Sequence, residues 1–135
     1  MSTVQRKMAA RTLGLVLLFA CGSETLEPGL PEGPGFLAVR LTTPNTDDGG
    51  ILFTLSGGPI DSVRVSLKQV LTGDAGANER RVIVAGALSN GTVASFWVPE
   101  RRDVANYRAV LEQATVIATY EQQTITSYVL SVVVQ

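Results

Sequence analysis

The side chains that could do chemistry in this sequence form a short set, because histidine is missing and cysteine occurs once, at Cys21. Histidine is the commonest general base and a frequent metal ligand. Its absence excludes a histidine-based catalytic triad, and together with the single cysteine it excludes zinc sites built on cysteine and histidine. One cysteine cannot form an intramolecular disulfide. We therefore expect no cofactor, and carboxylates, aromatic rings and arginines remain as the candidates.

Oxygen-bearing side chains cluster in one glycine-rich turn, where Asn45 precedes Asp47 and Asp48. Oxygen ligands at close spacing could hold calcium, which makes Asp47 and Asp48 the metal candidates. The spacing is not that of an EF-hand loop, however, and turns use Asn, Asp and Gly for backbone reasons alone. A carboxylate pair could also hydrolyse a glycoside, although no spacing in the chain marks one. A small carboxylate-dependent hydrolase is thus the alternative to a protein without enzymatic activity.

Two aromatic residues and two arginine pairs make up the candidate binding surface. Phe96 and Trp97 could stack on a sugar ring. The alternative interpretation is that Trp97 is buried as the core tryptophan of the fold. The arginines could meet an anionic glycan or the carboxylates of a partner. Their alternative is a solvated strand end, where they pair with neighbouring acidic residues and contribute little. These arginines are Arg80, Arg81, Arg101 and Arg102.

The elements that must position these residues follow from the hydrophobic alternation, which has period two from Phe36 onward and predicts half-buried strands. Tyr107–Thr119 fits a strand, and it also fits a helix with Asp103 as N-cap; we favour the strand because its neighbours are strands. Thr72–Asn78 reads as a loop. The predicted strands lie within Phe36–Thr42, Ile51–Ser56, Ser62–Lys68, Arg80–Leu88, Thr92–Val98, Tyr107–Thr119 and Thr124–Val134.

Ser89-Asn90-Gly91 predicts a two-residue hairpin turn of type I′, in which both central residues adopt positive φ. With Asn90 and Gly91 as the loop, Val84 faces Trp97, and both arginine pairs meet at the open end. Both faces of this hairpin would be apolar, whereas a sandwich strand normally buries one face. Either another segment covers the second face or it binds a partner.

The N-terminal part of the chain has the features of an export signal. Arg6, Lys7 and Arg11 precede the apolar run Thr12–Ala20, and residues 1–20 contain no acidic residue. The run is shorter than the roughly 20 residues that a membrane span needs. Removing this segment leaves eight basic residues against twelve acidic ones, a formal charge of −4. Such a charge argues against binding nucleic acid. The Pro-, Gly- and Glu-rich stretch 22–35 predicts a linker.

Leu18-Phe19-Ala20-Cys21 resembles the bacterial lipobox, in which a leucine, a tolerant position and a small residue precede the cysteine. The resemblance implies that the signal is removed and that Cys21 carries diacylglycerol and an acylated amino group. The protein would then be anchored outside the cytoplasm. Because Gly22 rather than Asp follows Cys21, the Gram-negative sorting rule implies the outer membrane. Each buried methylene contributes about 0.8 kcal/mol, so two or three acyl chains hold a protein durably.

About seven short strands with regular turns predict an all-β antiparallel β-sandwich. The segments GFLAVRLTTPNTDDGGILFTLSG and SFWVPE, with a Tyr-x-Ala strand at Tyr107, resemble the cohesin-like and immunoglobulin-like sandwiches of bacterial surface proteins. We therefore predict a signal peptide at 1–20, a lipidated cysteine and linker at 21–35, and a sandwich domain at 36–135. The expected role is structural or binding, at the cell envelope, with envelope proteins or glycans as partners.

Overall fold

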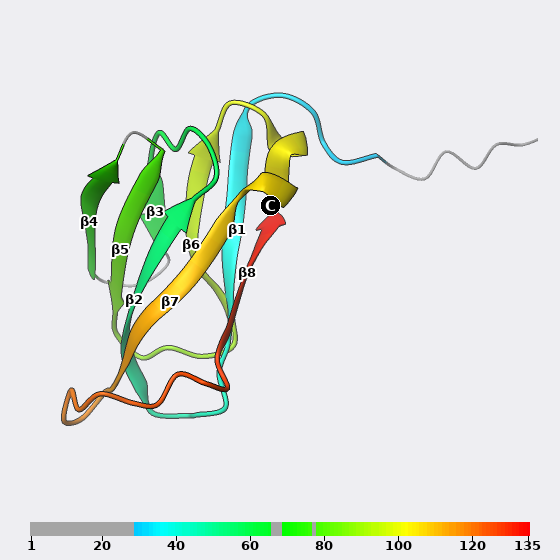
Figure 1. The fold of residues 1–135 in the computed structure, drawn as a ribbon. Coiled ribbons are helices and arrows are strands. Elements are labelled where there is room, and N and C mark those ends of the chain that lie inside the picture. Colours follow the sequence, from blue (N-terminus) through cyan, green and yellow to red (C-terminus); the bar gives the residue numbers. More distant parts are fainter. Residues whose placement is uncertain (1–28, 66–68, 77) are drawn as a thin grey trace, which may run out of the picture.

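The period-two alternation of apolar residues produces strands throughout the part of the chain that the computed structural model describes, residues 29–65, 69–76 and 78–135. Two antiparallel sheets pack face to face, as Figure 1 shows, which confirms the predicted sandwich. The predicted signal, Cys21 and the first part of the linker lie outside the described residues. The strands are β1 (Gly35–Thr42), β2 (Asp48–Ser56), β3 (Val63–Val65), β4 (Gln69–Gly76), β5 (Glu79–Ala85), β6 (Gly91–Val98), β7 (Arg108–Val116) and β8 (Val129–Val134).

The two sheets contain four strands each. Sheet A has the order β3-β6-β1-β8, and sheet B has the order β4-β5-β2-β7. Only β4 and β5 are neighbours both along the chain and within a sheet; every other connection between consecutive strands crosses from one sheet to the other. Consecutive strands therefore mostly lie in different sheets, and residues far apart in sequence become neighbours at each end of the sandwich.

The core lies between the sheets and consists of the inward-facing residue of each alternating pair. Phe53 on β2 and Phe96 on β6 are fully buried and are the largest side chains of this layer. Aliphatic residues of both sheets surround them, as the alternation predicts. These include Leu37, Val39 and Leu41 from β1, Ile51 and Leu55 from β2, Val82 and Val84 from β5, and Val93 and Val98 from β6.

The predicted hairpin of β5 with β6 is wrong. β5 pairs with β2 and β4 in sheet B, whereas β6 pairs with β1 and β3 in sheet A. Gly91 has φ of 133°, but Asn90 does not adopt positive φ, so no type I′ turn forms. The connection instead crosses the sandwich: Gly86 N–H donates to Gly49 O (2.9 Å), Leu88 N–H donates to Asp48 O (3.0 Å), and the Leu88 side chain enters the core.

Two further segments differ in part from the expectation. The loop predicted at Thr72–Asn78 is mostly strand, because β4 continues through Gly76 as the partner of β5. The favoured strand at Tyr107–Thr119 is confirmed as β7, and the helical alternative is wrong for this segment. A short 3-10 helix, η1 (Arg101–Asn106), precedes β7, and its N-cap is Glu100, whose carboxylate accepts from Arg102 N–H at 3.0 Å.

Candidate functional site

Trp97 lies on the outer face of sheet A, because alternation along β6 sends Phe96 into the core and Trp97 outward. The alternative that made Trp97 the core tryptophan is therefore wrong. Trp97 stands opposite Phe36 of β1, and the two rings meet edge to face with centroids 5.1 Å apart. Arg64 of β3 lies over the other ring of this pair, 4.5 Å from the Phe36 centroid. These neighbours fix the orientation of the indole.

A hollow of about 310 Å³ adjoins Trp97; we name it the Trp97 hollow. Its lining combines the indole ring with two exposed polar side chains, Asp61 and Asn78. Backbone hydrogen bonds hold Asp61 beside Trp97: Asp61 N–H donates to Trp97 O at 3.1 Å, and Trp97 N–H donates to Ser62 O at 2.8 Å. The remaining lining residues are Pro59, Ile60 and Pro99.

Two side chains from the interior hold the wall formed by Pro59 and Ile60. The Tyr107 hydroxyl donates to Pro59 O at 2.8 Å, and Arg80 Nη2 donates to Ile60 O at 3.2 Å. Burial raises the pKa of Tyr107 above its usual value, and the nearby Asp103 carboxylate raises it further. The hydroxyl therefore stays protonated and keeps donating throughout the neutral range. These two bonds hold this wall of the hollow in place, and a preorganised wall lowers the entropic cost of binding.

The composition of the Trp97 hollow suits one class of ligand. A sugar ring presents an apolar C–H face, which an aromatic ring can cover, and hydroxyl groups around its rim. A carboxylate accepts hydrogen bonds from such hydroxyls, and an amide both donates and accepts. Mostly apolar walls with a few fixed polar groups are the general pattern of small-molecule sites. Trp97, Asp61 and Asn78 supply these three functions within one hollow.

Phe96 does not belong to this surface. Its side chain is 0% exposed and packs against the ring of Tyr107, with centroids 5.4 Å apart. The sequence-based assignment of Phe96 to a binding surface is therefore wrong. Adjacent residues of a strand point to opposite sides of the sheet, so Phe96 and Trp97 could not both face a ligand.

The four candidate arginines do not form one patch, because the hairpin that would have joined them does not exist. Arg80 does not line the Trp97 hollow, but it bonds the backbone of one lining residue at Ile60 O. Arg81 pairs with Glu112 of β7 at 2.6 Å on the outer face of sheet B. Arg101 Nη2 donates to Glu32 O at 2.8 Å, and Arg102 forms an ion pair with the Glu32 carboxylate. Arg81 and Arg102 thus pair with acidic side chains, as the alternative of surface pairing predicts, whereas Arg80 and Arg101 bond backbone carbonyls.

Glu112 is held as a carboxylate by two neighbours. The Thr54 hydroxyl donates to one of its oxygens, and Arg81 Nη2 donates to the other. These hydrogen bonds, that of Thr54 first, lower the pKa of Glu112 below its usual value. The carboxylate is therefore already occupied by partners on the protein surface.

The two calcium candidates differ in burial, because Asp48 belongs to a buried polar network and Asp47 lies on the surface beside it. Asp48 is 1% exposed, and its two oxygens accept from the hydroxyls of Thr43 and Tyr128. Burial raises the pKa of Tyr128, and its bond to Asp48 adds to this shift. Asp47 is exposed and accepts from Gln123 at 3.4 Å. Among the described residues no three acidic side chains gather as metal ligands, so calcium binding stays an untested prediction.

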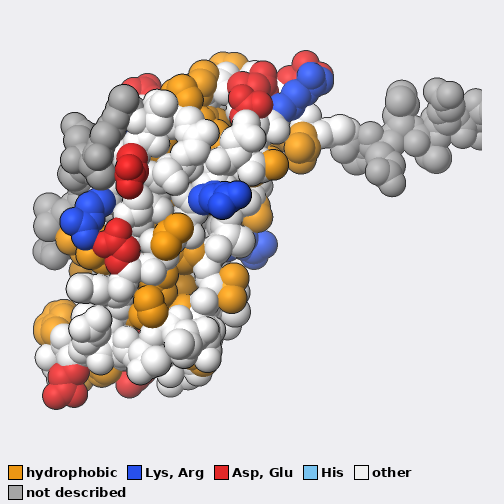
Figure 2. Space-filling view, in the orientation of Figure 1, with side chains coloured by type: hydrophobic (Ala, Val, Ile, Leu, Met, Phe, Trp, Pro, Cys, Tyr) orange, Lys and Arg blue, Asp and Glu red, His pale blue; other side chains and the backbone are white. Residues whose placement is uncertain are grey.

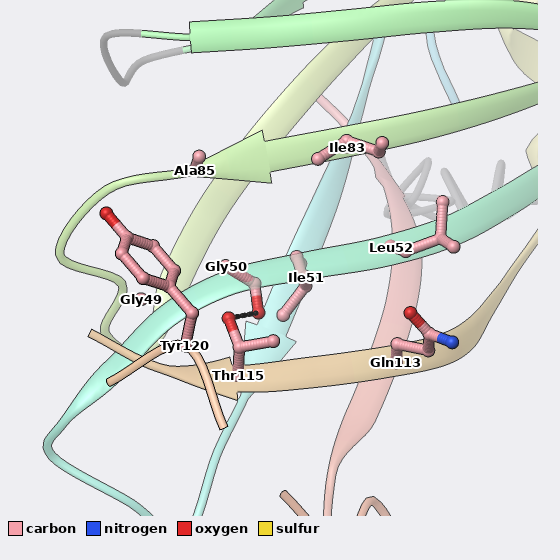
Figure 3. A pocket seen from close by; sticks show the side chains of 9 residues that line it. All are labelled: Gly49, Gly50, Ile51, Leu52, Ile83, Ala85, Gln113, Thr115 and Tyr120. Atoms are coloured by element: carbon pink, nitrogen blue, oxygen red, sulfur yellow. Dashed lines mark hydrogen bonds between the residues drawn. The ribbon is translucent and has the colours of Figure 1, made fainter. Parts of the chain in front are cut away.

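A second hollow, of about 200 Å³, lies on the outer face of sheet B beneath Tyr120, and sequence reasoning missed it. Figure 3 shows Tyr120 beside the glycine pair Gly49 and Gly50, with Ile83 and Gln113 farther along the sheet. Tyr120 is 71% exposed and has φ of 57°, the left-handed region that usually belongs to glycine. Figure 2 shows hydrophobic side chains scattered among polar ones over this face. The lining is mostly apolar and lacks a charged group.

Comparison of the chain with protein-family models, with curated proteins and with solved structures finds no match. Within residues 29–65, 69–76 and 78–135, no helix has the length and apolar character to cross a membrane. The arguments for a function therefore come from the geometry of the two hollows and from the sequence.

Proposed function

We propose that this protein is a lipid-anchored module of the bacterial cell envelope that binds a glycan in the Trp97 hollow. The observation that carries the binding role is the meeting of a fixed indole ring with Asp61 and Asn78 in one hollow. The lipobox resemblance at Cys21 supports the anchor. The likeness to cohesin-like and immunoglobulin-like sandwiches is compatible with a binding module, but a fold does not define a function.

The position of the hollow supports a ligand close to the membrane. β1 begins at Gly35, opposite Val98, so the chain enters the sandwich at the end where Trp97 and Pro99 line the hollow. The segment before β1 is fixed there, since Arg101 N–H donates to Gly33 O at 3.0 Å. Fourteen linker residues, if extended, reach roughly 40 Å at ~3.1 Å each. The hollow would thus be held within that distance of the lipid headgroups.

A binding role fits the hollow better than the hydrolase alternative. Asp61 is the only acidic side chain among the described residues that line it. Hydrolysis of a glycoside by the usual route needs two carboxyl groups facing the scissile bond. Asp48 is buried in its own hydrogen-bonded network, and Glu112 lies on the outer face of sheet B, so neither carboxylate lines the hollow. The hollow therefore offers recognition groups without a second acid or base.

The anchor is tested with a Cys21→Ser variant expressed from the full chain in a bacterial host. We expect wild type to incorporate a fatty-acid label and to remain with membranes after a high-salt wash, because salt does not release acyl chains. Cys21→Ser should lose the label completely and keep the uncleaved signal. Ser23→Ala is the matched control, and it should behave as wild type. Labelling of Cys21→Ser to the wild-type level would refute lipidation at this cysteine.

Glycan binding is tested with the mature chain carrying Ser at position 21, mixed with the polysaccharide fraction of the host envelope. We expect co-sedimentation, and Trp97→Ala should weaken it about tenfold, since aromatic contacts of this kind contribute ~1.4 kcal/mol including burial. Trp97 is the only tryptophan of the chain. Binding should therefore also change the intrinsic fluorescence of the wild-type protein.

Tyr120→Ala is the matched control, because it removes an exposed aromatic ring from the opposite sheet. It should leave co-sedimentation unchanged, and circular dichroism should show both variants folded. If Tyr120→Ala lost binding while Trp97→Ala retained it, we would infer that the glycan site lies on sheet B instead. Absence of any binding by wild type would contradict the glycan proposal and leave the anchor to be judged by the labelling experiment.

A further inference from the structure

The four edge strands of the sandwich differ in their protection against pairing with another chain. Sheet A ends in β3 and β8, and sheet B ends in β4 and β7. An edge strand exposes backbone N–H and C=O groups on its open side, and natural proteins protect such edges with charges, prolines, bulges or short length. The four edges can therefore be compared by sequence and by shape.

Three of the edges carry such protection. β3 is only three residues long and contains the exposed Arg64. β4 contains Asp74 and two glycines in its sequence. β7 contains Arg108 and Glu112, and its pairing with β2 is interrupted by two irregularities of register. Each of these edges would meet a like charge or an irregular partner in a symmetric pairing.

β8 has none of these devices in its sequence, although the 3-10 helix η1 lies close to its C-terminal end (Figure 1). Its six residues, VLSVVV, include no charge, no proline and no glycine, and they pair with β1 in an unbroken register. Within the described part of the chain, β1 is its only strand partner. Figure 1 shows β8 at the margin of the molecule. β-branched, uncharged segments of this length are those that add readily to another strand.

We propose that β8 pairs with β8 of a second copy of this chain, antiparallel about a two-fold axis at Ser131. In this register Val129 faces the partner copy's Val133, Leu130 faces its Val132, and the two Ser131 residues face each other. Leu130 and Val132 pack on the core, while Val129 and Ser131 are exposed on the outer side. Inner residues thus meet inner ones, and outer residues meet outer ones.

This self-complementarity favours a second copy over an unrelated strand. A two-fold axis places equivalent residues opposite each other, so any charge on the strand would face its own kind. β8 is the described edge on which that penalty is absent. The two four-stranded sheets A would join into one continuous sheet of order 3-6-1-8-8-1-6-3. The proposal depends neither on the lipid anchor nor on the glycan site.

The first test uses cross-linking in the mature chain with Ser at position 21, which then contains no cysteine. Ser131→Cys should give a covalent dimer on mild oxidation, because directly opposed residues of an antiparallel pair lie about 4.5–5.5 Å apart, within disulfide range. Val110→Cys is the matched control: it is 57% exposed on the edge strand of the other sheet and should remain monomeric. Equal cross-linking of both variants, or none in Ser131→Cys, would overturn the proposal.

The second test measures mass against concentration by sedimentation equilibrium. Wild type should show a monomer–dimer equilibrium, and Ser131→Lys should raise its dissociation constant by roughly tenfold or more, because it opposes two like charges. Val110→Lys should leave the equilibrium unchanged. A wild-type chain that stays monomeric, or a dimer that persists in Ser131→Lys, would show that β8 is not the interface. If Ser131→Lys fails to fold, the cross-linking pair decides alone.

Discussion

Replacing Asp48 by Ala should destabilise the domain by about 3 kcal/mol in urea unfolding, since hydrogen bonds to charged groups contribute ~1.5–3 kcal/mol each and this change removes two of them. The Asp48 side chain is 1% exposed and accepts from Thr43 and Tyr128. Its loss removes the acceptor of the buried Thr43 hydroxyl, while the Tyr128 hydroxyl keeps Gln123 Oε1 as an acceptor at 2.6 Å. Domains of this size have total stabilities of roughly 5–15 kcal/mol, so the effect is large.

Asp47→Ala is the matched control in the same turn. Asp47 is exposed, and its carboxylate accepts from the Gln123 amide at 3.4 Å. Surface substitutions of this kind stay within about 0.5 kcal/mol of wild type. Asp48→Asn should fall between the two, because the amide keeps the volume and can still accept one hydroxyl. If Asp48→Ala unfolds at the same urea concentration as Asp47→Ala, the buried network does not stabilise the fold.

The layer architecture could be predicted because it depends on local alternation. Each of the alternating runs contains a strand with one side toward the core, including the ambiguous run that forms β7, although β3 and β8 are shorter than predicted and only partly buried. The pairing could not be predicted in the same way. β5 and β6 are apolar and adjacent in sequence, yet they belong to different sheets, since Gly86–Asn90 crosses the sandwich. A period-two pattern predicts which residues of a strand face the core, but it does not predict which strands pair with each other.

Of the candidate site, the sequence predicts only the central residue, Trp97. Asp61 and Asn78 also line the hollow, but they lie in connections whose sequence is typical of ordinary loops. Tyr120 has a positive φ, for which the sequence gives no signal in a non-glycine residue. The sequence shows Asp48 as an acidic turn residue, but its hydrogen-bond partner Tyr128 lies 80 positions away. The long-range hydrogen bonds of Asp48 could therefore not be predicted from its place in an acidic turn.

Gly57 occupies the position where a single added methyl group should cost the most. It begins the turn after β2 with φ of 120°, and an ideal Cβ there would lie 1.9 Å from Asn106 O and 2.8 Å from Tyr107 Cα. Both obstacles are backbone atoms just before β7, whose pairing with β2 holds them in place. If either the turn at Gly57 or the backbone at Asn106 shifted, the close contact that places Tyr107 beneath Pro59 would be lost.

Gly57→Ala should therefore destabilise the domain by about 4 kcal/mol, combining backbone strain of ~1–3 kcal/mol with overpacking of ~1–3 kcal/mol. Gly91→Ala separates the two contributions, because Gly91 has φ of 133° but no atom within 4 Å of its ideal Cβ. That control should lose only the strain. Urea unfolding of the three proteins measures both differences. Equal losses in the two variants would mean that the chain at Asn106 yields to the new methyl group, and the wall of the Trp97 hollow would then be less rigid than its hydrogen bonds indicate.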